Sequence, residues 1–474
     1  MGTILEVDLK SFAYDEDNIL ENINLKIEKG EIILLTGNSG CGKSTLLRLM
    51  NGLIPEFYEG KLIGEIKLKG KLLSKYKKGE LAKYIGNVFQ NPKDQFFCTI
   101  VEDEIALVGE NMGMPRHELI KRVDEVLDLL EIEHLRYKSI FDLSGGERQK
   151  VAIACTLVYD TDLIFFDEPS SSLDYKSIEN LKEIFCILKN LGKTIVVADH
   201  RIYYLKSLYD RLILMERGEI KSIYKNGELR PEMCSGLGLR VLDEGFLKAE
   251  KNPIYTKNVI EFNNIKVMQN KEKIMNEVSF SLREGEVMGI IGKNGTGKTT
   301  LARTITGLTG KKQNTNLGLN EKERLKNSYY VQQDVDSQIF LDTVENELLI
   351  TSKNQDKNLI KRLLKTFGLW EERISHPQKL SGGQKQRLAV ITALLSGREL
   401  IILDEPTAGL DYRNMEVMAN LLNEFSKRFP IIIITHDTEL LFKCCHYVLL
   451  LDKNTNNKIK VKGNECKIFE FIKA

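Results

Sequence analysis

Residues 37–45 constrain the fold of this chain more than any other part of its sequence. The apolar run 32–35 comes before them and predicts a strand, and residues 46–50 follow at helical spacing. Glycines let such a loop fold around an anion without Cβ clashes, and the helix start adds its positive end. This order predicts a phosphate-binding loop made of Gly37, Asn38, Ser39, Gly40, Cys41, Gly42, Lys43, Ser44 and Thr45.

In a loop of this kind, the Lys43 ammonium group reaches the β- and γ-phosphates and the Ser44 hydroxyl binds Mg²⁺. One such match can be accidental, because glycine-rich turns often precede helices. This chain contains the loop twice, with each residue of the second copy 255 positions after its counterpart. The second loop consists of Gly292, Lys293, Asn294, Gly295, Thr296, Gly297, Lys298, Thr299 and Thr300.

The repeat extends well beyond the two loops. Residues 143–149, which begin Leu-Ser-Gly-Gly, recur as residues 380–386, a displacement of 237. The second copy is therefore about 18 residues shorter between its loop and this motif, and the loss falls after Gly307, where the first copy has residues 54–78. We expect a first domain at 3–230, a linker at 231–256 that forms an ordered strap or short helices, and a second domain at 257–474.

Within each copy, strands alternate with helical stretches. In the first copy the apolar runs 163–166 and 194–197 flank residues 178–191, which have helical periodicity. Continuous apolar runs of this length are typical of strands buried on both faces, so we predict an α/β fold with a parallel sheet. Residues 101–135 form a mostly helical insert that we expect to be a separate helical subdomain.

Charge, hydrophobicity and cysteine spacing argue against several classes of function. The 474 residues have a formal net charge of +1, so the sequence lacks the excess of basic residues that is typical of nucleic-acid-binding proteins. No apolar run approaches the roughly 18–20 residues of a membrane helix. The eight cysteines show no paired spacing for zinc or redox chemistry, and the start of the sequence has no secretory pattern, so we expect a cytoplasmic protein.

Paired acidic residues end one predicted strand in each copy. These are Asp167 and Glu168 in the first copy, and Asp404 and Glu405 in the second. A carboxylate at the tip of a buried strand beside a phosphate loop can hold Mg²⁺, directly or through water. The next carboxylate can then polarise an attacking water. A solvated acidic pair is the alternative, and the loop upstream in both copies argues against it.

Two further side-chain types recur after strands. His200 and His436 occupy the same place in the repeat, which favours a contact with a γ-phosphate over a merely structural histidine. Gln90 and Gln333 also correspond, and a glutamine at a strand end can bind the metal or its water. Each has a second glutamine five residues later, for which an ordinary loop amide remains possible.

A second glycine-rich helix start lies in each copy, at Ser144, Gly145 and Gly146 and at Ser381, Gly382 and Gly383. One such motif can be simple capping by the serine. Because the chain has two helix-start motifs in each copy, we favour a second anion site, with each nucleotide held from both sides.

Together these motifs resemble those of the ABC transporter ATPases. The resemblance covers nearly the whole chain, and each copy carries the full set of motifs. In the terms of that family, the copies carry Walker A, the Q-loop glutamine, the signature, Walker B, a D-loop with Asp174 or Asp411, and an H-loop histidine. The resemblance implies that the copies close head-to-tail around two ATP molecules, each held by one copy's loop and the other copy's signature. It assigns Glu168 and Glu405 as general bases, and Ser44, Gln90, Asp167, Thr299, Gln333 and Asp404 as Mg²⁺ ligands.

No catalytic residue is missing from either site, so we expect both to hydrolyse ATP. The one visible departure concerns the aromatic residue that stacks on adenine in this family. Tyr14 suits that role in the first copy, whereas Gln269 stands at the corresponding position in the second. We therefore expect looser adenine binding at the second site.

A finer resemblance lies in residues 88–97 and 99–106, which are similar to the ATPases of energy-coupling factor (ECF) importers. It implies a membrane scaffold subunit and a small substrate-capture membrane subunit as partners, no nucleic acid, a vitamin, vitamin precursor or metal ion as cargo, and a peripheral place on the cytoplasmic face of the membrane. Two alternatives stay open, a soluble tandem ATPase acting on ribosomes and the fused ATPase of a sugar importer.

Overall fold

The computed structural model describes residues 2–15, 17–77, 79–171, 173–252, 258–269, 272–309, 313–452 and 456–473. They form two compact units, Met1–Asp243 and Glu244–Ala474. The division falls inside the segment predicted as a linker. Short 3₁₀ helices occur there, η7 (Pro231–Met233) and η8 (Glu244–Phe246), and Leu239 and Leu242 are buried against the first unit.

A six-stranded sheet forms the centre of the first unit, in the order β10-β9-β3-β8-β7-β6. All neighbouring strands are parallel except the edge pair β9 and β10. The predicted parallel α/β core is therefore confirmed. The strands are β3 (Ile32–Gly37), β6 (Ile85–Val88), β7 (Leu163–Asp167), β8 (Thr194–Ala198), β9 (Arg211–Glu216) and β10 (Glu219–Lys225).

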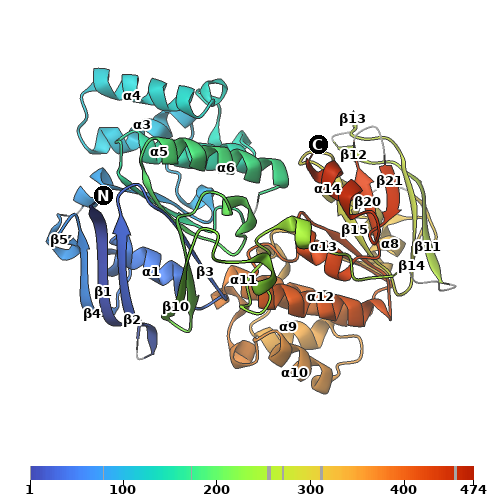
Figure 1. Ribbon diagram of the computed structural model, residues 1–474. Coiled ribbons are helices and arrows are strands. Elements are labelled where there is room, and N and C mark those ends of the chain that lie inside the picture. Colours follow the sequence, from blue (N-terminus) through green and yellow to red (C-terminus); the bar gives the residue numbers. More distant parts are fainter. Residues whose placement is uncertain are drawn as a thin grey trace. The chain divides into compact units, whose positions relative to one another are not determined.

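The remaining elements of the first unit form an antiparallel sheet and two groups of helices. The sheet, in the order β2-β1-β4-β5, consists of β1 (Thr3–Ala13), β2 (Asn18–Glu28), β4 (Lys61–Leu68) and β5 (Lys71–Leu72). Helices α1 (Lys43–Met50) and α6 (Tyr175–Asn190) follow β3 and β7. Figure 1 shows α3 (Val101–Asn111), α4 (Arg116–Leu129) and α5 (Gly145–Leu157) on the opposite side of this unit from β1, β2 and β4.

The second unit repeats this plan. Its six-stranded sheet, β17-β18-β19-β15-β20-β21, is parallel except at the edge pair β20 and β21. The strands are β15 (Val287–Ile291), β17 (Ser328–Val331), β18 (Leu400–Asp404), β19 (Ile431–Ile434), β20 (Tyr447–Leu451) and β21 (Asn456–Lys460). The helices are α7 (Lys298–Thr306), α9 (Val344–Thr351), α10 (Lys357–Thr366), α11 (Gly382–Leu395), α12 (Tyr412–Ser426), α13 (Thr438–Cys444) and α14 (Glu465–Lys473).

The shortening of the second copy affects its antiparallel part. In the first unit α2 (Leu53–Glu56) leads into β4, which pairs with β1 from Leu5↔Leu68 to Ala13↔Lys61. In the second unit β16 (Asn314–Thr315) pairs with β11 (Val259–Ile265) at two positions only, and α8 (Glu321–Asn327) follows. The strands β12 (Met268–Gln269), β13 (Glu272–Lys273) and β14 (Val278–Arg283) complete this part.

A buried histidine joins two parallel strands of the second unit. The main-chain N–H of His446 donates to the Val287 carbonyl oxygen at 2.8 Å, and its ring Nδ1 accepts from the Val287 N–H at 3.1 Å. Burial is the main reason that the pKa of His446 falls to about 4. The folded unit therefore holds this ring neutral well below its ordinary pKa of about 6.5.

This arrangement predicts an acid-sensitive second unit. Between about pH 6.5 and 4 the unfolded chain binds a proton at His446 that the folded chain does not, so stability is lost as the pH falls. At pH 5 we expect this group to cost about 2 kcal/mol relative to pH 8. The His446→Asn variant keeps an acceptor for Val287 but cannot titrate. Its melting temperature, measured from pH 8 to 5, should fall less steeply than that of the wild type, and parallel slopes would contradict the assignment.

Candidate nucleotide-binding sites

The first phosphate loop joins β3 to α1. Gly42, the residue before the helix, has φ +98°, and a Cβ there would lie 2.5 Å from Leu20 Cδ2. Only glycine fits this backbone. The Lys43 side chain is buried and crosses its own loop, where Nζ donates to the carbonyl oxygens of Gly37 at 3.0 Å and Asn38 at 3.2 Å. The predicted loop thus holds its lysine by two of its own main-chain carbonyl groups.

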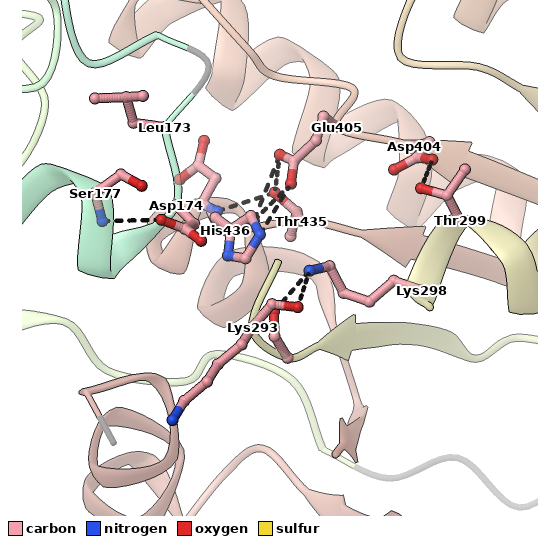
Figure 2. Close-up of polar contacts among 12 residues, drawn as sticks. Leu173, Asp174, Ser177, Lys293, Lys298, Thr299, Asp404, Glu405, Thr435 and His436 are labelled. Carbon is pink, nitrogen blue, oxygen red and sulfur yellow. Dashed lines mark hydrogen bonds and ion pairs between the residues drawn. The ribbon is translucent and has the colours of Figure 1, made fainter. Parts of the chain in front are cut away.

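The second loop joins β15 to α7 with the same geometry. Gly297 has φ +95°, and a Cβ there would lie 2.5 Å from Met275 Cε. The Lys298 Nζ donates to the carbonyl oxygens of Gly292 at 2.6 Å and Lys293 at 3.0 Å (Figure 2). The position of Cys41 is taken by Thr296, whose hydroxyl donates to the Lys293 carbonyl oxygen at 2.8 Å.

Each loop places a hydroxyl group on the first acidic residue of its unit. The Ser44 Oγ donates to Asp167 Oδ1 at 3.1 Å, and the Thr299 Oγ1 donates to Asp404 Oδ2 at 2.9 Å (Figure 2). One hydroxyl and one carboxylate, completed by phosphate oxygens and water, form the oxygen set that Mg²⁺ prefers. The side chains therefore fit a magnesium nucleotide, for which the ion supplies charge neutralisation at the phosphates.

The two acidic side chains differ in their electrostatic surroundings. Burial, followed by the negative charge of Glu168, raises the pKa of Asp167 to about 6. Burial also raises the pKa of Asp404, while hydrogen bonds from Tyr330 and Thr299 act in the opposite direction. The Asp404 carboxylate therefore has one more side-chain donor than that of Asp167.

The predicted general bases have unusual backbone angles. Glu168 has φ +43° and Glu405 has φ +49°. These values lie in the left-handed region of the backbone angles, which residues other than glycine rarely adopt. In each unit the main-chain N–H of the glutamate donates across to the end of the next strand, to the Ala198 carbonyl at 2.7 Å and to the Ile434 carbonyl at 2.9 Å. These bonds hold a sharp turn immediately after the strand, so each glutamate lies at the carboxyl edge of its sheet.

In the first unit, Glu168 is surrounded by the other predicted site residues. The Gln90 Nε2 donates to Glu168 Oε2 at 2.7 Å, and His200 Nε2 lies 3.4 Å from Glu168 Oε1. The same histidine nitrogen lies 3.5 Å from Lys43 Nζ. The structure therefore brings the loop lysine, histidine, glutamine and glutamate of this copy together.

In the second unit, Glu405 is held differently. Its carboxylate accepts from the Thr435 hydroxyl at 3.2 Å and from the main-chain N–H of His436 at 3.1 Å (Figure 2). The His436 Nε2 lies 3.9 Å from Glu405 Oε1. Gln333 is exposed after β17 and, within the described residues, does not reach Glu405. The two copies thus differ in what orients the glutamate.

The second glutamine of each pair stabilises the loop. Gln95 Oε1 accepts from the Phe89 N–H at 3.2 Å, and Gln338 Oε1 accepts from the Gln332 N–H at 2.8 Å. Each therefore braces the main chain one residue before Gln90 or Gln333. These contacts agree with the possibility, left open by the sequence, that the two residues are loop amides.

The signature motifs lie at exposed helix starts. Ser144 caps α5 in a reciprocal pair with Glu147, and Ser381 caps α11 in the same way with Gln384. Capping leaves other main-chain N–H groups of the first turn directed outward, where an anion can bind. Both interpretations of the serines are therefore compatible with the geometry.

The D-loop aspartates are helix caps as well. Asp174 Oδ1 accepts from the Ser177 N–H at 2.9 Å at the start of α6, and Asp411 Oδ1 accepts from the Asn414 N–H at 2.7 Å at the start of α12. Both carboxylates are buried. Their predicted part in nucleotide binding stays a prediction, and Ser172 of the first D-loop lies outside the described residues.

Tyr14, the predicted adenine platform, lies beside the first loop. Its hydroxyl donates to Thr45 Oγ1 at 3.5 Å, and its ring meets Phe12 edge-on with 5.0 Å between centroids. The main chain of Gln269 lies in β12, but its side chain is outside the described part of the structure. The expected difference in adenine stacking therefore stays a prediction.

One residue of the second site was missed at the sequence level. The Tyr330 hydroxyl donates to Asp404 Oδ2 at 2.8 Å, and burial raises the pKa of this tyrosine well above its ordinary value. Tyr330 stands three residues before Gln333, where the first copy has Asn87 before Gln90. A position-by-position comparison of the repeats would have pointed to this difference.

Comparison with known proteins places these sites in a family context. The sequence matches the ABC transporter family over residues 20–171 and 275–408. A Treponema denticola protein with the provisional name ABC transporter ATP-binding protein is 40% identical over 93% of this chain and 94% of its own length. A Bacillus subtilis protein, provisionally named HMP/thiamine import ATP-binding protein YkoD, is 33% identical over 94% of this chain and 90% of its own length.

Among solved structures, one of ribosome-bound archaeal Pelota and ABCE1 contains a chain with the same fold. The TM-score is 0.71 at 22% identity, and the match covers 96% of this chain and 78% of that chain. This likeness concerns the fold alone. It agrees with the prediction of two tandem α/β ATPase domains.

Proposed function

Because this chain belongs to the ABC transporter family, and is therefore an ATPase that uses ATP and Mg²⁺, we propose that it energises a membrane importer of the ECF type. Its cargo in this proposal is a vitamin, a vitamin precursor or a metal ion. The similarity to a relative named for HMP and thiamine import supports the direction of transport. The observation that carries the proposal is a pair of exposed apolar surfaces at equivalent places in the two copies.

In the first unit, the apolar surface lies on two paired segments of the helical part. Phe97 is 85% exposed and Tyr137 is 74% exposed. The segments are joined by hydrogen bonds from the Val101 N–H to the Lys138 carbonyl and from the Ile140 N–H to the Thr99 carbonyl. Aromatic side chains exposed on an ordered backbone are typical of protein interaction sites.

The second unit presents the same arrangement. Phe340 is 75% exposed and Ile374 is 71% exposed, at the repeat positions of Phe97 and Tyr137. Their segments are joined by the hydrogen bond from the Val344 N–H to the Ser375 carbonyl. Two equivalent surfaces suit a scaffold subunit that lays one apolar helix on each copy.

A buried glutamate holds each exposed phenylalanine in place. Glu104 Oε2 accepts from the Phe97 and Cys98 N–H groups, at 2.9 and 2.6 Å. Glu347 Oε2 accepts from the Phe340 and Leu341 N–H groups, at 3.1 and 3.0 Å. Both carboxylates belong to the first turn of the following helix, where negative charge is favourable. The surface is therefore built on a braced turn, which supports a binding role.

The proposal includes the arrangement of sites and domains. The first ATPase domain spans residues 3–230, the linker 231–256 and the second domain 257–474. One ATP is held by the first loop, Gln90, Asp167, Glu168 and His200 with Ser381, Gly382 and Gly383. The other is held by the second loop, Gln333, Asp404, Glu405 and His436 with Ser144, Gly145 and Gly146.

The partners in this proposal are a membrane scaffold and a small capture protein, and the place of action is the cytoplasmic face of the membrane. None of the helices in the described parts of the chain is long and apolar enough to cross a membrane. Attachment therefore depends in this proposal on the two apolar surfaces. An ATPase acting on ribosomes is the competing function, and the experiment below separates the two.

The test is co-purification from detergent-solubilised membranes with a tagged chain. We expect a scaffold protein and a small hydrophobic protein with the wild type, and at least a tenfold loss of both with the Phe97→Asp, Phe340→Asp double variant. Buried aromatic anchors at interfaces typically contribute about 2 kcal/mol or more each. Mass spectrometry of the bound fraction is the measurement.

The matched control replaces exposed apolar residues elsewhere in each unit, Leu191→Asp and Leu319→Asp, and should keep both partners. ATP binding should be equal in all variants. Recovery of ribosomal proteins without membrane proteins would overturn the importer proposal, and equal recovery from both double variants would overturn the assigned surface.

A further inference from the structure

The second site contains a contact that the first site lacks. Tyr330 lies in β17, and its hydroxyl donates to Asp404 Oδ2 at 2.8 Å. The same oxygen accepts from the Thr299 hydroxyl at 2.9 Å. Asp404 itself ends β18, the strand paired with β17, so the two side chains come from neighbouring parallel strands. The contact is therefore built into the sheet.

The residue at the matching position of the first unit, Asn87, has a different hydrogen-bond partner. Asn87 stands where the second copy has Tyr330, and its Oδ1 accepts from Asn51 Nδ2 at 2.8 Å. Asp167 accepts from the Ser44 hydroxyl at 3.1 Å. An asparagine side chain is also too short to replace the phenol at that distance from the strand. The two metal carboxylates are therefore oriented by different means.

A carboxylate that ligates a metal ion needs its free oxygen to be directed at the ion. Hydrogen bonds from the surrounding side chains fix that direction, so that the carboxylate loses less rotational freedom when the metal ion binds. At the second site, two donors converge on Oδ2 and leave Oδ1 for coordination. The loop hydroxyls of Ser44 and Thr299 are both expected to turn to the metal. Asp404 then keeps the Tyr330 hydroxyl as a donor that is not itself a metal ligand.

We propose that Tyr330 is a positioning residue of the second magnesium-nucleotide site, holding the Asp404 carboxylate for Mg²⁺. In the first site, the residue at the equivalent position is Asn87, which is bonded to Asn51 and not to Asp167 in the described part of the chain. Mg²⁺ affinity at the second site therefore depends on a phenol that the first site does without. This inference rests on membership of the ATPase family and is independent of the importer function.

Neighbouring tyrosines on one strand provide the experiment with its control. Tyr330→Phe removes one hydroxyl group and keeps the ring, whereas Tyr329→Phe makes the same change at the adjacent position, whose side chain packs in the other core of the unit. Both are made in the full chain carrying Lys43→Ala, so that nucleotide binding reports the second site. The readout is the fluorescence of TNP-ATP titrated with Mg²⁺, and the same binding in EDTA.

We expect Tyr330→Phe to raise the Mg²⁺ concentration for half-maximal binding by about tenfold, the lower end for residues that orient metal ligands. Binding in EDTA should be unchanged, and Tyr329→Phe should match the background chain in both conditions. In the opposite background, Lys298→Ala, Tyr330→Phe should have no effect.

Three results would overturn the proposal. One is a Mg²⁺ titration of Tyr330→Phe that overlays the control. Another is an equal loss in Mg²⁺ and in EDTA, which would make Tyr330 a general support of the loop. The third is the same shift in the Lys298→Ala background, which would make the effect remote from the second site.

Discussion

The double variant Glu168→Gln, Glu405→Gln is expected to hydrolyse ATP about 10² to 10⁴ times more slowly than the wild type while binding ATP with similar affinity. A glutamine has nearly the shape of glutamate but cannot accept a proton from an attacking water, and general bases typically contribute a factor of this size. Phosphate release under saturating ATP, together with TNP-ATP displacement, measures both quantities.

The geometry explains why the effect should fall on kcat. Glu168 and Glu405 follow directly on Asp167 and Asp404, whose side chains contact the loop hydroxyls of Ser44 and Thr299. Each glutamate therefore lies next to the place where the phosphates and Mg²⁺ are expected.

Single variants test whether both sites work. If both hydrolyse ATP independently, each single variant keeps about half of the rate, and only the double variant shows the full loss. A control at Glu179, a half-buried residue of α6 paired with Lys182, should leave the rate unchanged when it is replaced by glutamine. A double variant with wild-type turnover would contradict the assignment of the general bases.

The second large effect concerns the loop lysines. We expect Lys43→Ala or Lys298→Ala to weaken ATP binding at the affected site by about 30-fold to several thousandfold. Removing one partner of a buried, hydrogen-bonded charge contact usually costs about 2–5 kcal/mol. Calorimetric titration of the full chain with ATP and Mg²⁺ should then report one tight site in place of two.

Lys293→Ala is the matched control for this prediction. Its side chain is exposed and, in Figure 2, its ammonium group points away from Lys298, whereas its carbonyl oxygen accepts the Lys298 hydrogen bond. The alanine variant keeps that carbonyl and should bind ATP within a few-fold of the wild type. Two unchanged sites in Lys298→Ala would show that the second loop does not bind nucleotide through its lysine.

The parts of the site that the sequence predicted well are those set by neighbouring residues. Gly42 and Gly297 determine the backbone conformation of the two loops. The lysine, the hydroxyl residue and the start of the helix come within the next three residues, so their positions are set by that conformation. The strand before each acidic pair is recognisable because it is apolar throughout. In these cases local backbone geometry decides where the side chain goes.

What the sequence did not predict are contacts between strands. Tyr330 meets Asp404 because β17 and β18 are parallel neighbours in a particular register, with Tyr330 paired to Ile402. Gln90 donates to Glu168, whereas Glu405 accepts from Thr435 and His436 in the described part of the chain, although Gln90 and Gln333 match in the repeat. The partners of Glu405, Thr435 and the His436 N–H, come from the end of a third strand. Such pairings depend on the whole sheet, which no short motif specifies.

The presence of two units on one chain has a consequence for how a tandem ATPase can evolve. A covalent connection keeps the copies at an effective concentration of the order of millimolar, whatever the abundance of the protein. The copies are also always present one to one. Differences such as Asn87 against Tyr330 can then accumulate in one half alone, and each half is free to specialise without a second gene to keep in balance.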